Sequence, residues 1–282
     1  MLRLLGRRYV LNIQDIHPDA TIATGMVRNR LLIAILRLIE HLAYRFASRI
    51  SVISEGFKRN LIAKGVPARK IVVIPNWIDT DAITPQPQDN PFAREVGTAG
   101  RFTALYSGTI GLVSGAEIVL DVAAALAGSD IALLMVGEGQ VKSRIEQQAA
   151  ERSLGNLRFA PFQPRERLPD VLSTASVGLV TLLPGHGANS VPSKILGYLS
   201  AARPVIASVD RGSDTWNFVQ EARCGLCVPP GDPLALADAI RRLHADPELC
   251  TRLGRQGRMY LETHLRRQVI TRRYAEVLCP RH

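Results

Sequence analysis

The 282-residue chain is 46% hydrophobic and 21% charged, a globular composition that excludes a disordered chain, and no apolar run is long enough to cross a bilayer. The net charge is +10, of which residues 1–50 carry +5 (eight Lys and Arg against three Asp and Glu). Residues 241–282 carry +6 (ten against four), a balance that suits an anionic membrane surface or a phosphorylated ligand. With 5% aromatic residues, four cysteines and no recognisable secretory leader, we expect a cytoplasmic protein with no nucleic-acid platform and no disulfide scaffold.

The first 90 residues predict a thin parallel sheet with helices between its strands. Three short apolar runs predict strands, and two segments with helical spacing lie between them. The strands are Tyr9–Ile13, Ile50–Ser54 and Ile71–Ile74, and the helices are Asn29–Ser48 and Glu55–Lys64. Residues 75–100 are rich in Pro and Asp and lack periodicity, so we expect the domain boundary there.

From Phe102 onward, strands and helices alternate regularly. The strands are continuous apolar runs, which is typical of a parallel sheet covered on both faces. The predicted strands are Phe102–Ser107, Ile131–Val136, Leu157–Ala160, Val177–Leu182, Val205–Val209 and Gly225–Val228. The predicted helices are Ala116–Leu126, Gln140–Glu151, Arg165–Thr174, Ser193–Ala201, Thr215–Glu221 and Pro233–His244. This pattern predicts an α/β, Rossmann-like, doubly wound domain.

Two further helices are expected at the end of the chain, over Glu248–Thr263 and Arg266–Leu278. We therefore divide the chain into residues 1–90, a partial first domain, and residues 91–265, a complete α/β domain. We expect the last segment, residues 266–282, to cross back to the first domain.

Asn189-Ser-Val-Pro-Ser-Lys194 is the strongest candidate site in the sequence. It follows a predicted strand and opens a predicted helix, the place where parallel sheets bind ligands. Pro192 suits a first helical turn, and the amides of Ser193, Lys194 and Ile195 would carry the positive end of the helix dipole. With the Ser193 hydroxyl and the Lys194 ammonium group, this segment predicts a diphosphate site. The alternative is an ordinary capped helix with a solvated lysine.

Glycine-rich turns follow two other strands on the same rim. Ser107-Gly-Thr-Ile-Gly111, with Ser114-Gly115 beyond it, and Val136-Gly-Glu-Gly139 permit close approach of the backbone to a ligand. Either turn could be a plain strand-to-helix connection. Three such loops on one rim favour a phosphate or nucleotide site.

The remaining reactive residues predict no metal centre. Cys224 and Cys227 form one CxxC pair, but no second pair or nearby pair of histidines completes a zinc site. Packing at the end of a strand explains the pair better than a metal or redox site does. The histidines outside the first domain's Gln14–Pro18 segment stand alone and are of the structural or solvated kind.

An ordered set of motifs resembles the retaining GT-B glycosyltransferases of family 4, in particular the branch that builds exopolysaccharides such as colanic acid. The matching stretches are Val52-Ile-Ser-Glu55, Ile74-Pro-Asn-Trp-Ile-Asp79, Tyr106-Ser-Gly-Thr-Ile-Gly111, Val136-Gly-Glu-Gly139, Ser190-Val-Pro-Ser-Lys194 and Arg203-Pro-Val-Ile-Ala207. The resemblance covers residues 52–278. No single stretch is specific, but the ordered set is.

The resemblance implies a UDP- or GDP-sugar donor, a lipid-linked or polysaccharide acceptor, and no required metal or cofactor. Donor-binding residues would be Gly108, Thr109, Ser114, Glu138, Phe162, Gln163, Asn189, Ser190, Val191, Ser193 and Lys194. Gly108, Thr109 and Ser114 would lie near the diphosphate or sugar, and Pro161-Phe-Gln163 would border the base. The two glutamates of the family's acidic loop fall on Asn189 and Gly197 here, so this chain lacks the second glutamate, to which the resemblance assigns recognition of the sugar hydroxyls.

In the first domain, relatives place a His-Asp pair near the reacting sugar, where this chain has Gln14-Asp15. Asp15 and His17 are therefore candidate catalytic residues for acceptor contact or proton handling, and the alternative is that they are turn residues. The reaction implied by the resemblance depends on stabilising the leaving phosphate, so no protein base is obligatory.

The family's glycine-rich loop after its first strand has no counterpart before Tyr9. We therefore expect a truncated chain, or one complemented by a separate polypeptide, that binds nucleotide but transfers sugar poorly alone. The apolar helix over Asn29–Ser48 is expected in the core of the first domain. The alternative places it on the inner face of the plasma membrane, peripherally, near a polyprenyl-linked acceptor.

Two other functions compete with the transferase. One is a non-catalytic module that binds nucleotide sugars, favoured by the absent loop and the lost glutamates. The other is a GT-B sugar epimerase, which would require a complete first domain and acidic residues that the sequence does not show.

Overall fold

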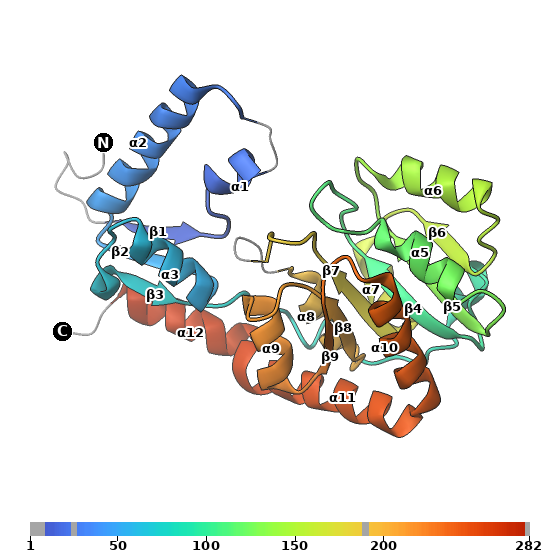
Figure 1. Cartoon of the computed structure of the whole chain (residues 1–282). Helices are drawn as coiled ribbons and strands as arrows, with labels where there is room; N and C mark the ends of the chain where they lie inside the picture. Colours follow the sequence, from blue (N-terminus) through green and yellow to red (C-terminus); the bar gives the residue numbers. More distant parts are fainter. Residues whose placement is uncertain (1–8, 24–26, 188–191, 280–282) are drawn as a thin grey trace. The chain divides into compact units, whose positions relative to one another are not determined.

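A computed structural model describes residues 9–23, 27–187 and 192–279. The chain divides into two compact units. Unit 1 contains the residues up to Trp77 and those from Arg267 onward, and unit 2 contains most of the residues between them. Figure 1 shows the elements of each unit.

The described part of unit 1 holds a three-stranded parallel sheet of order β1-β2-β3. Its elements are β1 (Val10–Ile13), α1 (Asp19–Ala23), α2 (Arg30–Phe46), β2 (Arg49–Val52), α3 (Glu55–Ala63), the short 3-10 helix η2 (Ala68–Lys70), β3 (Ile71–Val73) and α12 (Arg267–Leu278). The central strand β2 pairs Ile50 with Leu11 on one side and with Ile71 on the other. Ile50, Val52 and Phe57 are fully buried in the core of this unit.

Hydrogen bonds hold α12 against the sheet of unit 1. The guanidinium group of Arg273 donates to the backbone carbonyl of Val73 at 2.7 Å, and the Tyr274 hydroxyl lies 3.4 Å from the side-chain oxygen of Asn12. The last helix therefore contacts the edge strand β3 and the strand β1.

The described part of unit 2 holds a six-stranded parallel sheet of order β6-β5-β4-β7-β8-β9, with helices on both faces (Figure 1). The strands are β4 (Phe102–Ser107), β5 (Ile131–Val136), β6 (Leu157–Ala160), β7 (Val177–Thr181), β8 (Val205–Ser208) and β9 (Gly225–Val228). The helices are α4 (Pro91–Glu95), α5 (Ile118–Ala125), α6 (Lys142–Glu151), η3 (Arg165–Arg167), α7 (Leu168–Ser173), α8 (Lys194–Ser200), α9 (Asp214–Ala222), α10 (Pro233–Ala245), α11 (Pro247–Tyr260) and the π-helix η4 (Leu261–Leu265).

Burial on both faces of the sheet explains the continuous apolar strands of the sequence. All six residues of β5 and all five of β7 are buried. A strand covered on both sides gains from an apolar residue at every position, so its sequence does not alternate. The predicted α/β, doubly wound, Rossmann-like architecture is confirmed.

Local capping fixes where several helices begin. The Asp232 side chain accepts from the amide of Ala235 at 2.9 Å and caps α10, and Asp246 accepts from Leu249 at 2.8 Å and caps α11. Both helices start with proline, whose missing N–H needs no partner in the first turn.

The units divide between Trp77 and Ile78, inside the segment 75–100 in which the boundary was expected and before residue 90, where the first domain was taken to end. Residues 78–90 belong to unit 2 because their polar groups bond there. The backbone amide of Gln86 donates to the Ser173 hydroxyl at 3.0 Å, and the Gln88 amide group donates to the Ser176 hydroxyl at 2.8 Å. The predicted aperiodic segment also contains α4, a short helix capped by Asn90, whose Phe92 is fully buried.

The prediction that α2 lies in the core is wrong for much of the helix. Tyr44 is its one buried residue, and large apolar side chains such as Leu31 (71% exposed) and Leu38 (57%) face outward. The apolar pattern covers more than one face of the helix, and the described residues pack against one face only. None of the helices that the structure describes is long and apolar enough to cross a membrane.

Candidate functional site

The strand order reverses between β4 and β7 in unit 2. The chain moves outward from β4 through β5 to β6, and then returns to β7 on the other side of β4. In open parallel sheets, the carboxyl ends of the two strands at such a reversal border a crevice that binds ligands. The loop after β4 and the segment leading from β7 into α8 meet at this point.

Lys194, the first residue of α8, reaches across to the end of β4. Its Nζ atom lies 3.3 Å from the centre of the Tyr106 ring, a cation–π contact. A Cβ at Gly108 would lie 3.5 Å from Lys194 Cε, an ordinary contact distance, so the two residues are direct neighbours. The structure thus brings together two predicted donor-binding residues, Gly108 and Lys194.

The surroundings of Lys194 favour its neutral form over its charged form. Burial lowers the pKa of Lys194 from 10.5 to about 7. No carboxylate among the described residues forms an ion pair with it, so desolvation of the ammonium group is not offset. A half-buried lysine without a counter-charge is an attractive position for an anion.

Tyr198 fixes the orientation of α8, and sequence analysis did not identify it. It lies one turn after Lys194 on the same face of the helix. Its ring is fully buried against Gly178 of β7, where an added Cβ would lie 2.3 Å from the ring. Its hydroxyl accepts from the backbone amide of Ser107 at 2.7 Å, which ties α8 to the end of β4.

The two glycine-rich turns pack backbone against backbone. The amide of Gly108 donates to Val136 O and the amide of Ile110 donates to Glu138 O, each at 2.9 Å, so the pairing of β4 with β5 continues into the loops. A Cβ at Gly137 would lie 2.0 Å from Gly108 O, and one at Gly139 would lie 2.2 Å from Ile110 O. Only glycine permits this approach.

Fewer backbone amides are available to an anion than predicted. The amides of Gly108 and Ile110 are used by the second loop, and the amide of Ile195 donates to Pro192 O at 3.4 Å. The expectation that Ile195 offers a free amide is therefore wrong, because the first turn of α8 is tightened. The amide of Thr109 makes no hydrogen bond to another described residue. It remains available next to Gly108, the neighbour of Lys194.

The other predicted residues of the donor loops have structural contacts. The Ser114 hydroxyl donates to Gly111 O at 2.6 Å and closes the turn before α5. The Glu138 carboxylate pairs with Lys142 at 2.7 Å. Ser193 precedes α8 with an exposed side chain that makes no capping bond.

Phe162 and Gln163 follow β6, the edge strand of the same sheet. Phe162 is 53% exposed, and the Gln163 side-chain oxygen accepts from Arg167 at 2.9 Å. An exposed aromatic ring on this rim is available for stacking. The predicted residues Asn189, Ser190 and Val191 lie outside the described residues.

The segment that leads toward them is anchored by Asp210, which follows β8. Its carboxylate accepts from the amide of Gly185 at 3.0 Å and from the amide of Gly187 at 3.2 Å. An added Cβ at Gly187 would lie 2.8 Å from Ser213 Cβ, so the backbone runs close to the start of α9.

Asp15 and His17 belong to unit 1, where both follow β1 and are exposed. No hydrogen bond between their side chains is present. The predicted catalytic pair is thus a pair of exposed loop residues within its own unit.

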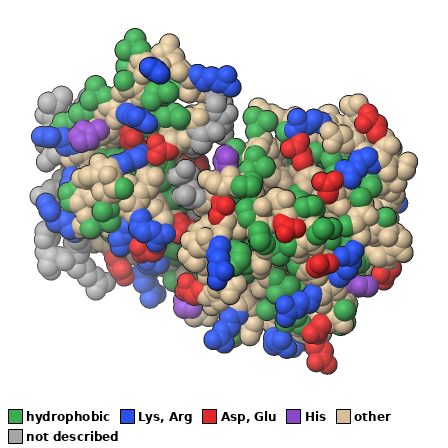
Figure 2. Space-filling view, viewed as in Figure 1, with side chains coloured by type: hydrophobic (Ala, Val, Ile, Leu, Met, Phe, Trp, Pro, Cys, Tyr) green, Lys and Arg blue, Asp and Glu red, His purple; other side chains and the backbone are tan. Residues whose placement is uncertain are grey.

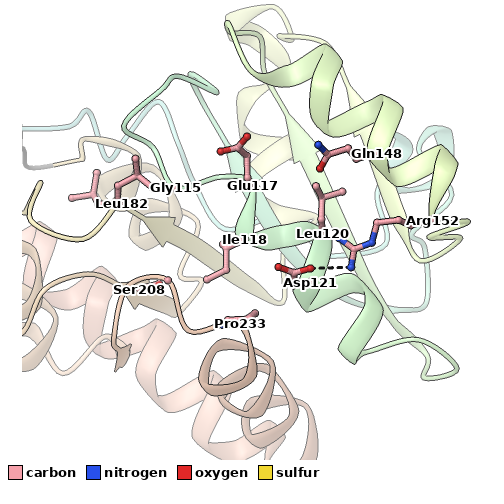
Figure 3. A pocket seen from close by; sticks show the side chains of 12 residues that line it. Gly115, Glu117, Ile118, Leu120, Asp121, Gln148, Arg152, Leu182, Ser208 and Pro233 are labelled. Atoms are coloured by element: carbon pink, nitrogen blue, oxygen red, sulfur yellow. Dashed lines mark ion pairs between the residues drawn. The ribbon is translucent and has the colours of Figure 1, made fainter. Parts of the chain in front are cut away.

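A separate cavity of about 280 Å³ opens beside the loop before α5 (Figure 3). The side chains of Glu117 and Asp121 line it, and Asp121 forms an ion pair with Arg152 at 2.9 Å. None of the predicted donor-binding residues lines it. Two carboxylates suit a diphosphate poorly, so the Lys194 position is the better candidate for a phosphate site.

The cysteine pair packs at β9, where Cys224 directly precedes the strand and Cys227 lies within it. Cys224 is fully buried, and burial raises its pKa to about 12 and that of Cys227 to about 11. All four cysteines are free thiols. No group of His, Cys, Asp or Glu within the described ranges is arranged to hold a metal ion.

A parallel sheet with a lysine and glycine loops at its reversal point is typical of nucleotide-binding transferases. The family model for glycosyl transferases group 1 matches residues 89–260, and the model for a glycosyl transferase 4-like domain matches residues 1–77. The chain belongs to the glycosyl transferases group 1 family. It has the GT-B type of fold, with α/β units of the Rossmann kind.

Two relatives illustrate the likeness in sequence. The chain is 27% identical to the putative colanic acid biosynthesis glycosyl transferase WcaI of Escherichia coli, over 97% of this chain and 68% of that protein. It is 27% identical to the probable glycosyltransferase WbjE of Pseudomonas aeruginosa, over 84% of this chain and 60% of that protein. The chain thus spans 60% of the length of one of these curated relatives and 68% of the other.

Solved structures show the same fold. Anabaena HepE, in a crystal structure with UDP and glucose, superposes with a TM-score of 0.83 at 19% identity, over 99% of this chain and 73% of that chain. At this level of identity the likeness concerns the fold alone.

Proposed function

We propose that the protein is a retaining glycosyltransferase that moves a hexosyl group from a UDP- or GDP-sugar to a lipid-linked or polysaccharide acceptor in cell-surface polysaccharide synthesis. The observation that carries the proposal is the position of Lys194, which lies half-buried at the strand reversal without a carboxylate partner among the described residues.

The diphosphate of the donor would occupy the space beside Lys194 Nζ and the amide of Thr109. When the bond from the sugar to the diphosphate breaks, negative charge grows on the leaving phosphate. A lysine in a water-poor position stabilises this charge more strongly than a solvated one. The chain's own contribution is therefore to hold and neutralise the leaving group, and no metal or cofactor is needed for it.

In this proposal the nucleotide base lies near Phe162 and Gln163 of unit 2, and Asp15 and His17 of unit 1 contact the acceptor or handle a proton. The protein would work at the inner face of the plasma membrane, peripherally.

Replacing Lys194 with Ala tests the diphosphate site. We expect UDP or GDP to bind the parent chain and to bind Lys194→Ala about ten- to a hundredfold more weakly, because a charge-assisted contact to phosphate is lost. Calorimetric titration measures both affinities. Lys58→Ala is the control, since Lys58 belongs to unit 1, where it forms an ion pair with Glu55 of α3. Equal affinities for parent and Lys194→Ala, or no binding by the parent, would contradict the proposal.

A non-catalytic nucleotide-sugar-binding module is the second candidate. Gly197 favours it, because the resemblance places a sugar-binding glutamate there, and a Cβ at this position would instead lie 3.3 Å from Leu172. Turnover separates the two functions. A transferase releases UDP or GDP and extends an acceptor, whereas a binding module shows the same calorimetric heat with no product.

A further inference from the structure

Helix α2 of unit 1 exposes a continuous apolar surface, which we call the outer face. It consists of Leu31, Leu32, Ile35, Leu38, Ile39 and Leu42, each between 39% and 71% exposed. Their spacing places them in one sector of the helix, because residues three, four and seven apart share a face. An apolar sector along most of a 17-residue helix is unusual on a protein surface in water.

The opposite side holds α2 to its unit. Tyr44 is buried in the core, and its hydroxyl donates to Glu40 at 2.8 Å. Lys64, which directly follows α3, pairs with the same carboxylate at 2.5 Å. These contacts fix which side of α2 faces the unit, so the outer face points away from it.

A basic strip borders the outer face. Arg30, Arg37 and Arg45 recur every seven or eight residues, and His41 lies among them. All four are exposed, and no carboxylate among the described residues pairs with the three guanidinium groups. Glu40, the one acidic residue of α2, faces the unit. Figure 2 shows hydrophobic and basic side chains gathered together over this part of unit 1.

This charge pattern favours an anionic lipid surface over a second copy of the chain. Two copies packed through their outer faces would bring both basic strips into one interface, and neither outer face carries a carboxylate to compensate. A bilayer with anionic headgroups satisfies both features, because acyl chains accept the apolar sector and phosphates accept the arginines.

We propose that α2 lies in the plane of an anionic phospholipid membrane, with its outer face buried at the boundary of headgroups and acyl chains and its arginines among the phosphates. The helix does not cross the bilayer. This inference rests on the peripheral membrane location in the proposed function and names the surface responsible for it. It concerns unit 1 and requires no bound nucleotide, so it is tested apart from the transfer reaction.

Co-sedimentation of the full chain with lipid vesicles tests the proposal. We expect binding to vesicles of an equal mixture of phosphatidylcholine and phosphatidylglycerol, and much weaker binding to phosphatidylcholine alone. Added salt should weaken the binding, because it screens the arginines. Leu38→Glu should lower the partition coefficient about tenfold or more, because an apolar side chain of the buried sector is replaced by a charge.

Matched variants control for charge and exposure. Met259→Glu in unit 2 changes an apolar side chain that is 63% exposed, close to the 57% of Leu38, and should leave binding unchanged. Arg37→Glu should lower binding several-fold, whereas Arg165→Glu, at an exposed arginine of unit 2, should not. Far-ultraviolet circular dichroism checks the fold, and if Leu38→Glu does not fold, Arg37→Glu and the salt dependence decide the question.

Three results would overturn the proposal. They are equal binding to both kinds of vesicle, equal effects of Leu38→Glu and Met259→Glu, or a dimer in light scattering that Leu38→Glu dissociates. The last result would show that a second copy covers the outer face. UDP titration of the same samples keeps this outcome separate from the proposed transfer, because a failure of one leaves the other untouched.

Discussion

At the scale of single residues, Lys194 combines two properties that rarely occur together. Its ammonium group is placed over the Tyr106 ring, and burial lowers its pKa to about 7. Near neutral pH the free protein therefore contains both the neutral and the charged form. A bound diphosphate favours the charged form and raises the pKa again.

Nucleotide binding should consequently take up a proton above pH 7. We expect the affinity for UDP or GDP to be constant below the free pKa of about 7 and to fall as the pH rises from there toward 10.5. Calorimetric titration in two buffers with different ionisation enthalpies measures the proton uptake directly.

Lys194→Arg is the control for this pH dependence, because a guanidinium group stays charged throughout the range. The variant should bind without proton uptake and with an affinity that does not fall with pH. The same buffer dependence in Lys194→Arg and in the parent would assign the proton to another group.

At the scale of elements, the glycine-rich turns after β4 and β5 form one unit. Their backbones are hydrogen-bonded to each other, and their glycines leave no space for side chains between them. The shape of the rim beside Lys194 therefore depends on two loops that the sequence presents separately.

Gly137→Ala should disrupt this arrangement. The added Cβ would lie 2.0 Å from Gly108 O, at a φ of +150° that side chains rarely adopt. We expect a loss of unfolding free energy on the order of 3 kcal/mol in unit 2, together with weaker nucleotide binding. Denaturant unfolding and UDP titration measure the two effects.

Gly128→Ala is the matched control in the same unit. It also has a positive φ, of +78°, but its Cβ would meet nothing within 4 Å. This variant should lose about 1 kcal/mol of unfolding free energy, from backbone strain alone, and its nucleotide binding should be unchanged. If Gly137→Ala and Gly128→Ala lost similar amounts of unfolding free energy, the close approach of the two loops would not contribute to the stability of unit 2.

At the scale of the whole molecule, the two units have separate cores. Leu61 is fully buried in unit 1 and Leu236 in unit 2, each within its own apolar cluster. The proposed nucleotide site lies in unit 2. A ligand stabilises the part of a protein that binds it, by an amount set by its concentration relative to Kd.

Thermal unfolding should therefore show two transitions, and UDP or GDP should raise the transition of unit 2. The expected stabilisation is about 2.7 kcal/mol at a hundredfold excess over Kd. Scanning calorimetry of two variants assigns each transition to a unit. Leu61→Ala should lower the midpoint temperature of the transition of unit 1, and Leu236→Ala should lower that of the ligand-sensitive transition of unit 2. A nucleotide that raises only the transition lowered by Leu61→Ala would place the site in unit 1.

The sequence by itself determined the fold class and most of the elements, because apolar periodicity and capping residues act over a few neighbouring positions. The strands of unit 2, the start of α10 at Pro233 and the packing of Cys224 follow from such local patterns. It also placed Gly108 and Lys194 on one rim, since parallel strands end on the same side.

Only the tertiary structure decided which groups meet on that rim. The contact of Lys194 with Tyr106 and the anchoring of α8 by Tyr198 and Gly178 join residues from different strands, which no local pattern encodes. The boundary at Trp77 depends on hydrogen bonds of Gln86 and Gln88 to distant serines. The sequence left open whether α2 lies in the core or at the surface, because the same apolar side chains suit both positions. The exposed outer face of α2 was decided by the tertiary structure.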